Sequence, residues 1–214
     1  MRLQTQLALG EPAEWLGDWH PLVEQLGSAD GLAALSSLSA ALRTRPISDR
    51  AALRGFLGAY HSRILRPVEL PAIEAAYTHA VRNELRELIA LDQRLATEPG
   101  LQDFLAASRR VGRAQLRKLR PLRDERIVQR YLHAVETAQA HGWHTLVYGL
   151  TLALYSLPLR QGLVGYASQV TRGFIHSAAR PLRLSEMECR ALLNELCGHL
   201  AEDVEPLLAD YAKP

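Results

Sequence analysis

The stretch that decides the fold runs from His144 to Arg180 and reads HTLVYGLTLALYSLPLRQGLVGYASQVTRGFIHSAAR. No Asp, Glu, Lys or Arg occurs between Trp143 and Leu159, and most of this run is apolar. It is shorter than the roughly 20 residues that span a membrane, and Pro158 ends it. We therefore expect a helix buried in a protein core, followed after Pro158 by a second helix.

Helical periodicity continues along the rest of the chain, and no strand-like alternation persists. The expected helices are 14–26, 30–43, 49–64, 70–82, 84–96, 101–119, 124–140, 143–157, 159–179 and 185–211. The expected breaks are Pro46, Pro67, Pro71, Pro99-Gly100, Pro121, Gly142, Pro158 and Pro181. Because there is no low-complexity linker or internal repeat, residues 1–214 are expected to form a single all-α domain, a bundle of about ten helices.

Composition favours a soluble globular protein, with 48% hydrophobic and 22% charged residues. The net charge of +2 gives no indication of a nucleic-acid partner. Cys189 and Cys197 fall in one expected helix about 12 Å apart, which is too far for a disulfide. The first residues also lack the apolar core of a signal peptide. Together these features predict a cytoplasmic protein.

The last expected helix has a clear start and an apolar seam. Ser185 and Glu188 have the spacing of a capping box. The seam consists of Cys189, Leu193, Leu196, Leu200, Val204, Leu207 and Tyr211. Pro206 is expected to kink this helix near its end.

Two groups of side chains are candidates for metal ligation. His141 and His144 lie three residues apart, which suits one helix face, but no third ligand is near in sequence. The second group is His176, Cys189, Cys197 and His199. Because free cysteine is common in apolar cores, a structural role is favoured for the two cysteines. No metal site and no resident cofactor are expected.

The expected helix 101–119 combines small residues with arginines. Ser108 and Gly112 lie one turn apart and would let another helix come close, and Gly149 has a similar packing role. The basic residues are Arg109, Arg110, Arg113, Arg117, Lys118, Arg120, Arg123, Arg126 and Arg130. Arg109, Arg113 and Arg117 repeat at i, i+4 and predict a positive stripe. Such a stripe could bind phosphates, face solvent, or dock an acidic protein.

Nothing in the sequence argues for catalysis. It contains no nucleophile elbow, glycine-rich phosphate loop, HExxH or CxxC. Carboxylates such as Glu84 and Glu87 stand beside arginines and are interpreted as members of surface ion pairs.

Several stretches resemble the UreF family of urease accessory proteins. These are the apolar helix from His144 to Gly149, the turn Ser156-Leu-Pro158-Leu and the ending Ser177-Ala-Ala-Arg180. Ala107–Arg113 looks like the family's AS-x-x-x-G-R helix, and Leu88–Leu95 resembles the segment before it. The resemblance covers residues 47–196. Departures from the family pattern are Ala29–Ser39, Asp103, Leu105 and Ser185–Arg190.

The resemblance implies an all-helical homodimer without enzymatic activity. Family members bridge UreD (also called UreH) and the GTPase UreG, and act on the urease apoenzyme during nickel insertion and lysine carbamylation. Nickel would be handled by the complex, with neither nucleic acid nor membrane involved. The residues expected to meet partners are Arg180, Ser177, Arg109 and Arg113. Arg180 could instead cap the carbonyls of its helix.

Three other functions are alternatives to this one. A helical dimeric transcription regulator would need a basic N-terminal recognition helix, but residues 1–42 contain only Arg2 as Lys or Arg. A small haem protein or oxygenase would use His141 or His144. A UreF-like protein could also have been repurposed for another interaction.

Overall fold

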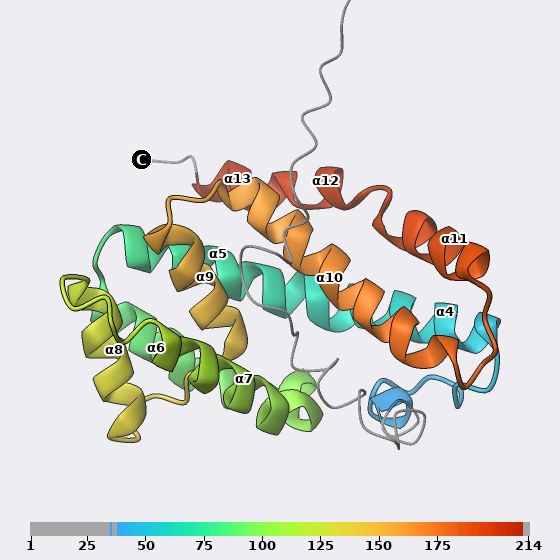
Figure 1. Ribbon diagram of the computed structural model, residues 1–214, viewed down its shortest axis with the longest axis horizontal. Helices are drawn as coiled ribbons and strands as arrows, with labels where there is room; N and C mark the ends of the chain where they lie inside the picture. The colour runs from blue at the N-terminus through green and yellow to red at the C-terminus, as the bar shows by residue number, and fades with distance from the viewer. Residues whose placement is uncertain (1–34, 36–37, 212–214) are drawn as a thin grey trace, which may run out of the picture.

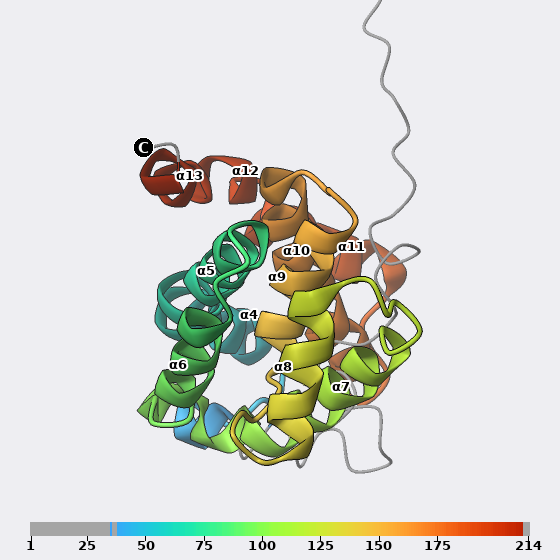
Figure 2. The ribbon, with the colours of Figure 1, turned by 90° about the vertical axis from the view of Figure 1, so that its left-hand side faces the viewer.

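The apolar stretch quoted at the outset forms α9 (His144–Leu154) at the centre of a helical bundle (Figures 1 and 2). The computed structural model describes Leu35 and residues 38–211. Every regular element among them is helical, which confirms the predicted all-α class. The predicted helix 14–26 and the first part of 30–43 lie outside the described residues. No described helix is long and apolar enough to cross a bilayer.

Helices α9 and α10 (Leu159–Ala179) reproduce the prediction made from this stretch. In α9 all residues from His144 to Leu150 are buried, together with Leu152. Pro158 has extended backbone angles and starts α10, because proline fits a helix start but cannot continue the preceding helix. The predicted core helix and the break at Pro158 are therefore confirmed.

The first long rod of the bundle contradicts the predicted breaks at Pro67 and Pro71. It runs without interruption through α4 (Arg50–Tyr60), a π-helical segment η1 (His61–Glu69) and α5 (Leu70–Val81). Pro67 lies inside η1, where backbone hydrogen bonds join residues five apart instead of four, as from Leu70 N to Leu65 O. The wider turn accommodates the proline ring, so the chain continues instead of breaking. Pro71 lies in the first turn of α5, where proline is tolerated.

The π-helical segment delivers polar side chains to the core. His61 is 4% exposed and its Nε2 lies 2.7 Å from the Thr171 hydroxyl, which itself donates to a backbone carbonyl in α10. The ring therefore donates through Nε2 in its neutral form. Glu69 is 5% exposed and accepts hydrogen bonds from Tyr60 and Tyr166. These bonds satisfy polar groups that would be costly to bury alone.

Three further helices pack beside α5 and α9 (Figure 2). They are α6 (Leu85–Leu95), α7 (Leu105–Lys118) and α8 (Arg126–Glu136), with a 3-10 turn η2 (Pro99–Phe104) leading into α7. Helix α7 packs chiefly on α9, and α6 on α5 and α8. The predicted helix 124–140 ends early, because Ala138 takes a left-handed conformation that begins the loop to α9.

The predicted single helix 185–211 is wrong. The chain forms α11 (Glu186–Cys197), α12 (Leu200–Asp203) and α13 (Glu205–Tyr211). Gly198 caps α11, and Pro206 falls in the first turn of α13, where it starts a helix instead of kinking one. The capping box of Ser185 with Glu188 is confirmed. The fully buried members of this region are Leu192, Leu200 and Val204, so the predicted seam is only partly correct.

Helices α5 and α9 form the largest helix pair, and Gly149 makes their close approach possible. A Cβ at Gly149 would overlap the carbonyl oxygen of Ile73 and lie 2.9 Å from the Ala76 Cβ. The structure thus confirms that Gly149 is a packing residue. A side chain here would have to displace backbone, which a closely packed core resists.

We expect Gly149→Ala to lower the free energy of unfolding by about 2 kcal/mol or more, because the added methyl overpacks the α5–α9 contact. Gly55→Ala is the matched control, since an added Cβ there meets nothing within 4 Å. Because alanine suits helices better than glycine, Gly55→Ala should leave stability unchanged or raise it by about 0.5 kcal/mol. Urea unfolding followed by circular dichroism measures both. Equal effects of the two substitutions would contradict this account.

His61 should make the fold sensitive to acid. Burial, helped by the Arg66 guanidinium, lowers the pKa of His61 from 6.5 to about 4. As the pH falls, the unfolded chain takes up the proton at His61 before the folded chain does. The contribution of neutral His61 to the free energy of unfolding is therefore complete above pH 6.5 and is lost as the pH falls from 6.5 to 4. The loss amounts to about 1.4 kcal/mol per pH unit within that window.

Urea unfolding at several pH values tests this prediction. The wild-type free energy of unfolding should fall more steeply below pH 6.5 than that of His61→Gln. The exposed His133→Gln serves as a control and should keep the wild-type slope. A wild-type slope in His61→Gln would assign the acid sensitivity to other groups.

Candidate partner-binding surface

A buried carboxylate organises the face of the molecule that carries the candidate site. Asp92, at the end of α6, has no exposed surface. Its side chain accepts from the backbone N–H groups of His141 and Gly142 at 2.6 and 2.9 Å and from the Tyr131 hydroxyl at 2.6 Å. Its own carbonyl accepts from the Trp143 indole at 2.7 Å. Asp92 therefore fixes the loop between α8 and α9 onto α6.

The same loop lies against α7, because Gly112 leaves room for it. A Cβ at Gly112 would overlap the carbonyl oxygen of Gly142 and lie 2.6 Å from the His144 nitrogen. Gly142 itself has φ of 74°, a left-handed conformation that suits glycine. The Ser108 hydroxyl accepts from the His144 N–H at 3.2 Å. Ser108 and Gly112 are confirmed as packing positions. The segment that packs against them is the loop before α9 together with the first residue of α9.

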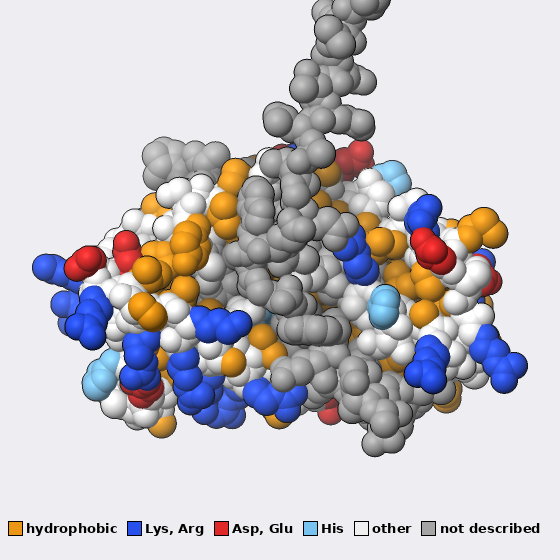
Figure 3. All heavy atoms as spheres, viewed as in Figure 1, with side chains coloured by type: hydrophobic (Ala, Val, Ile, Leu, Met, Phe, Trp, Pro, Cys, Tyr) orange, Lys and Arg blue, Asp and Glu red, His pale blue; other side chains and the backbone are white. Residues whose placement is uncertain are grey.

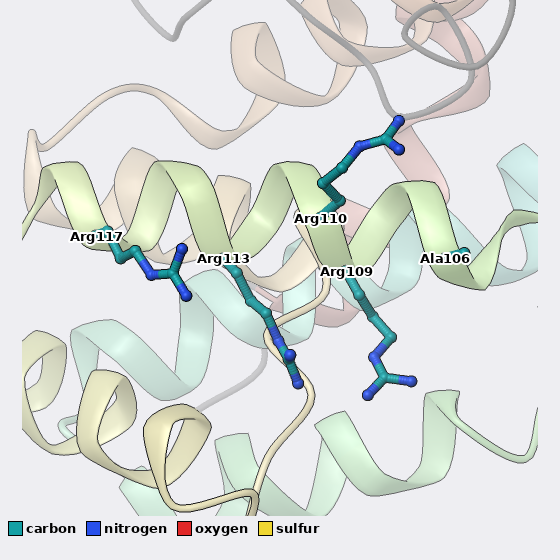
Figure 4. A pocket seen from close by; sticks show the side chains of 5 residues that line it. All are labelled: Ala106, Arg109, Arg110, Arg113 and Arg117. Carbon is teal, nitrogen blue, oxygen red and sulfur yellow. The ribbon is translucent and has the colours of Figure 1, made fainter.

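On the outer side of α7 lies a row of arginines, Arg109, Arg113 and Arg117, which we call the arginine ridge. Figure 4 shows Arg109 and Arg113 extending from one side of α7, Arg117 extending toward Arg113, and Arg110 pointing the other way. An open hollow of about 380 Å³ is lined by Ala106, Arg109, Arg110, Arg113 and Arg117. The positive stripe predicted from the i, i+4 spacing is therefore present.

Two members of the arginine ridge are held in place by the loop. The Arg113 Nε donates to the His141 carbonyl at 2.9 Å. The Arg109 guanidinium lies 5.8 Å from the centre of the Trp143 ring, within cation–π range. Arg117 is exposed and extends the row by one more turn. The ridge thus combines two oriented guanidinium groups with a third at the surface.

Positive charge on this side of the molecule extends beyond α7. Figure 3 shows Lys and Arg side chains gathered along its lower edge, over α6, α7 and α8. Helix α7 contains five basic residues and no Asp or Glu. Among the residues that the structure describes, no carboxylate forms an ion pair with Arg109, Arg113 or Arg117. The ridge therefore presents net positive charge to whatever approaches it.

The two histidines considered as ligands have structural surroundings. His141 lies in the loop before α9, so the pair does not share a helix face as the spacing suggested. Its ring lies beside that of Trp143, with centroids 5.2 Å apart and planes tilted by 43°. His144 is 3% exposed and packs against Tyr148 and Tyr166. These contacts indicate a packing role for both histidines.

The cysteines of α11 are free and half-buried. Burial raises the pKa of both thiols. Both therefore stay protonated near neutral pH, consistent with the structural role favoured for them. The described residues contain no group of three or more His, Cys, Asp or Glu side chains that could hold a metal ion.

The other predicted site residues lie at the end of α10. Arg180 is the exposed C-cap of that helix, and Ser177 is half-buried one turn earlier. Arg180 therefore has the position expected for either a partner contact or a helix cap. Arg109 and Arg113 lie together on α7, whereas Arg180 and Ser177 belong to a different element.

Reasoning from the sequence missed the role of Asp92. The signal was present, because Asp92 interrupts the apolar face of α6 formed by Leu88, Leu91 and Leu95. An acidic residue at a core position of an amphipathic helix needs donors to satisfy it. Those donors lie about 40 to 50 residues later in the sequence, at Tyr131, His141 and Gly142.

Asp92→Asn should lower the free energy of unfolding by about 2 to 4 kcal/mol, because an amide nitrogen replaces one buried acceptor and leaves a donor facing a donor. Asp103→Asn is the control, since Asp103 is exposed in η2 and should tolerate the change. Urea unfolding compares the two variants. Equal midpoints for Asp92→Asn and Asp103→Asn would show that the buried carboxylate does not hold the loop.

Comparison with known protein families agrees with this description. The UreF family model matches residues 47–197, which include every element from α4 to α11 and both groups of predicted site residues. A search of curated proteins gave no match. The family match coincides with the resemblance over residues 47–196 and covers most of the 214 residues. The chain therefore belongs to the UreF family of urease accessory proteins.

Proposed function

We propose that this protein is a non-enzymatic scaffold in urease maturation, which bridges UreD (UreH) and the GTPase UreG while nickel is inserted into the urease apoenzyme. The observation that carries the proposal is the family match over residues 47–197. Membership implies an accessory role alongside other maturation proteins.

Such a scaffold would act by differential binding. It would hold one conformation or nucleotide state of the GTPase more tightly than another, and so shift its population. The arginine ridge and the α10 end with Arg180 and Ser177 are the surfaces we propose for partner contact. The protein would work as a homodimer in the cytoplasm, with nickel carried by the complex and no resident cofactor.

A repurposed UreF-like interaction protein is the alternative. It is favoured by the departures of Ala29–Ser39 and Ser185–Arg190 from the family pattern. The first segment falls mostly outside the described residues. The second opens α11 with the Ser185–Glu188 capping box, so its residues serve the start of a helix.

Affinity purification of the tagged protein from the cells that encode it tests the proposal. We expect UreG and UreD to be recovered with it, together with less than one nickel per chain. Quantitative mass spectrometry and metal analysis measure both. Recovery of other proteins in place of these two would support the repurposed function and overturn the urease role.

Arg180→Ala should keep the fold and reduce recovery of a partner severalfold, because the side chain is exposed and removal of an interface arginine costs about 1 kcal/mol or more. Arg82→Ala is the matched control, since Arg82 is also an exposed arginine at a helix C-cap. Thermal unfolding checks that both variants are folded. Recovery of UreG and UreD at the wild-type level by Arg180→Ala would remove Arg180 from the site.

A further inference from the structure

We infer that the arginine ridge binds an acidic helix of a protein partner, whose carboxylates repeat one turn apart. This inference rests on the proposed function, because it names the chemistry of one partner in the maturation complex. The ridge consists of Arg109, Arg113 and Arg117, all of which line one hollow on α7.

The spacing of the ridge defines the first requirement. Residues four apart on an α-helix are separated by about 6 Å along its axis, so the three guanidinium groups rise from points about 6 Å apart. Glutamates at i, i+4 and i+8 of another helix repeat at the same interval. A guanidinium can engage a carboxylate with two parallel hydrogen bonds, so matching intervals allow three such contacts in register.

The second argument is that part of the ridge is already oriented. Arg113 is held by the His141 carbonyl through its Nε, which leaves the two terminal nitrogens as donors for a ligand. Arg109 lies over the Trp143 ring. Both anchors belong to the loop that Asp92 fixes. Fewer rotamers are lost on binding, so a larger share of the electrostatic attraction appears as affinity.

The third argument is that the ridge lacks an internal counter-charge, unlike other arginines of the molecule. Arg54 pairs with Glu195 and Arg160 with Glu205, each joining two helices. Within the described residues no carboxylate compensates Arg109, Arg113 or Arg117 in this way. An acidic partner would provide the compensation that these other pairs have within the chain.

A polypeptide fits better than a nucleic acid because carboxylates interrupt the basic surface around the ridge. From Arg109 to Arg117 the ridge itself extends about 12 Å, enough for two or three charges. Exposed acidic residues flank it, with Asp103 before α7 and both Asp124 and Glu125 before α8. Just beyond α7, Arg120 is already paired with Glu136. A phosphate backbone would meet these carboxylates, whereas a single acidic helix face would not.

Fluorescence anisotropy with the full chain tests the inference. One labelled alanine-rich peptide carries glutamates at i, i+4 and i+8, and a second has the same composition with its glutamates distributed around the helix. A single-stranded DNA of 20 nucleotides is the third probe. We expect the aligned peptide to bind about fivefold more tightly than the dispersed one, with affinity that falls as salt rises.

The ridge itself is tested by the double variant Arg109→Glu, Arg117→Glu. Arg113 stays unchanged because it also anchors the loop. We expect the double variant to weaken binding of the aligned peptide about tenfold or more. Lys118→Glu is the matched control, since Lys118 lies on the same helix about 140° from the centre of the ridge and should change binding less than about twofold. Thermal unfolding verifies that both variants are folded.

Three results would overturn the inference: equal affinity for the two peptides, an equal loss with Lys118→Glu, or tighter binding of the DNA than of the aligned peptide. The purification experiment tests the proposed function independently of the peptide measurements. If the chain prefers the aligned peptide but recovers neither UreG nor UreD, the inference about the ridge stands and the proposed function is wrong. If the chain recovers both proteins but binds the two peptides equally, the proposed function stands and the inference about the ridge is wrong.

Discussion

The hydrogen-bond shell of Asp92 is the constraint on which the rest of the structure depends. A carboxylate with no access to water is tolerated only when donors surround it, and three residues distant in sequence supply them, one in α8 and two in the loop that follows. This requirement fixes where the chain leaves α8 and where α9 begins. The start of α9 in turn determines how Gly149 meets α5, and thus how the two halves of the bundle come together.

The same constraint reaches the surface. The loop that Asp92 holds provides the carbonyl for Arg113 and the indole under Arg109. The orientation of charges at the surface is thus set by a group in the core. A charged surface binds a partner more tightly when its side chains are ordered beforehand, because flexible charged side chains lose much of their attraction to the entropy of ordering. Here Asp92, through the loop that it holds, orders Arg109 and Arg113, although no residue of the ridge is fully buried.

Most of the helices could be predicted from the sequence because their signals are local. The apolar run after His144, the stop at Pro158 and the i, i+4 arginines depend only on near neighbours. The errors arose where a local rule had an exception, as at Pro67, whose ring a π-helical turn accommodates. The break at Gly198 was missed because apolar periodicity continued across it. The role of Asp92 could not be deduced, because its donors are brought to it only by the completed fold.

The π-helical segment also sets the phase of the rod that contains it. Each turn with the longer hydrogen-bond step shifts the side chains that follow around the helix axis, so α4 and α5 present faces that a straight α-helix would not align. Helix α4 packs on α10 and α11, while α5 packs mainly on α9. Loss of a single residue between His61 and Glu69 would turn α5 by about 100°. Ile73 and Ala76 would then no longer face Gly149. The nine residues from His61 to Glu69 therefore tolerate neither insertion nor deletion, although the chain is helical on both sides of them.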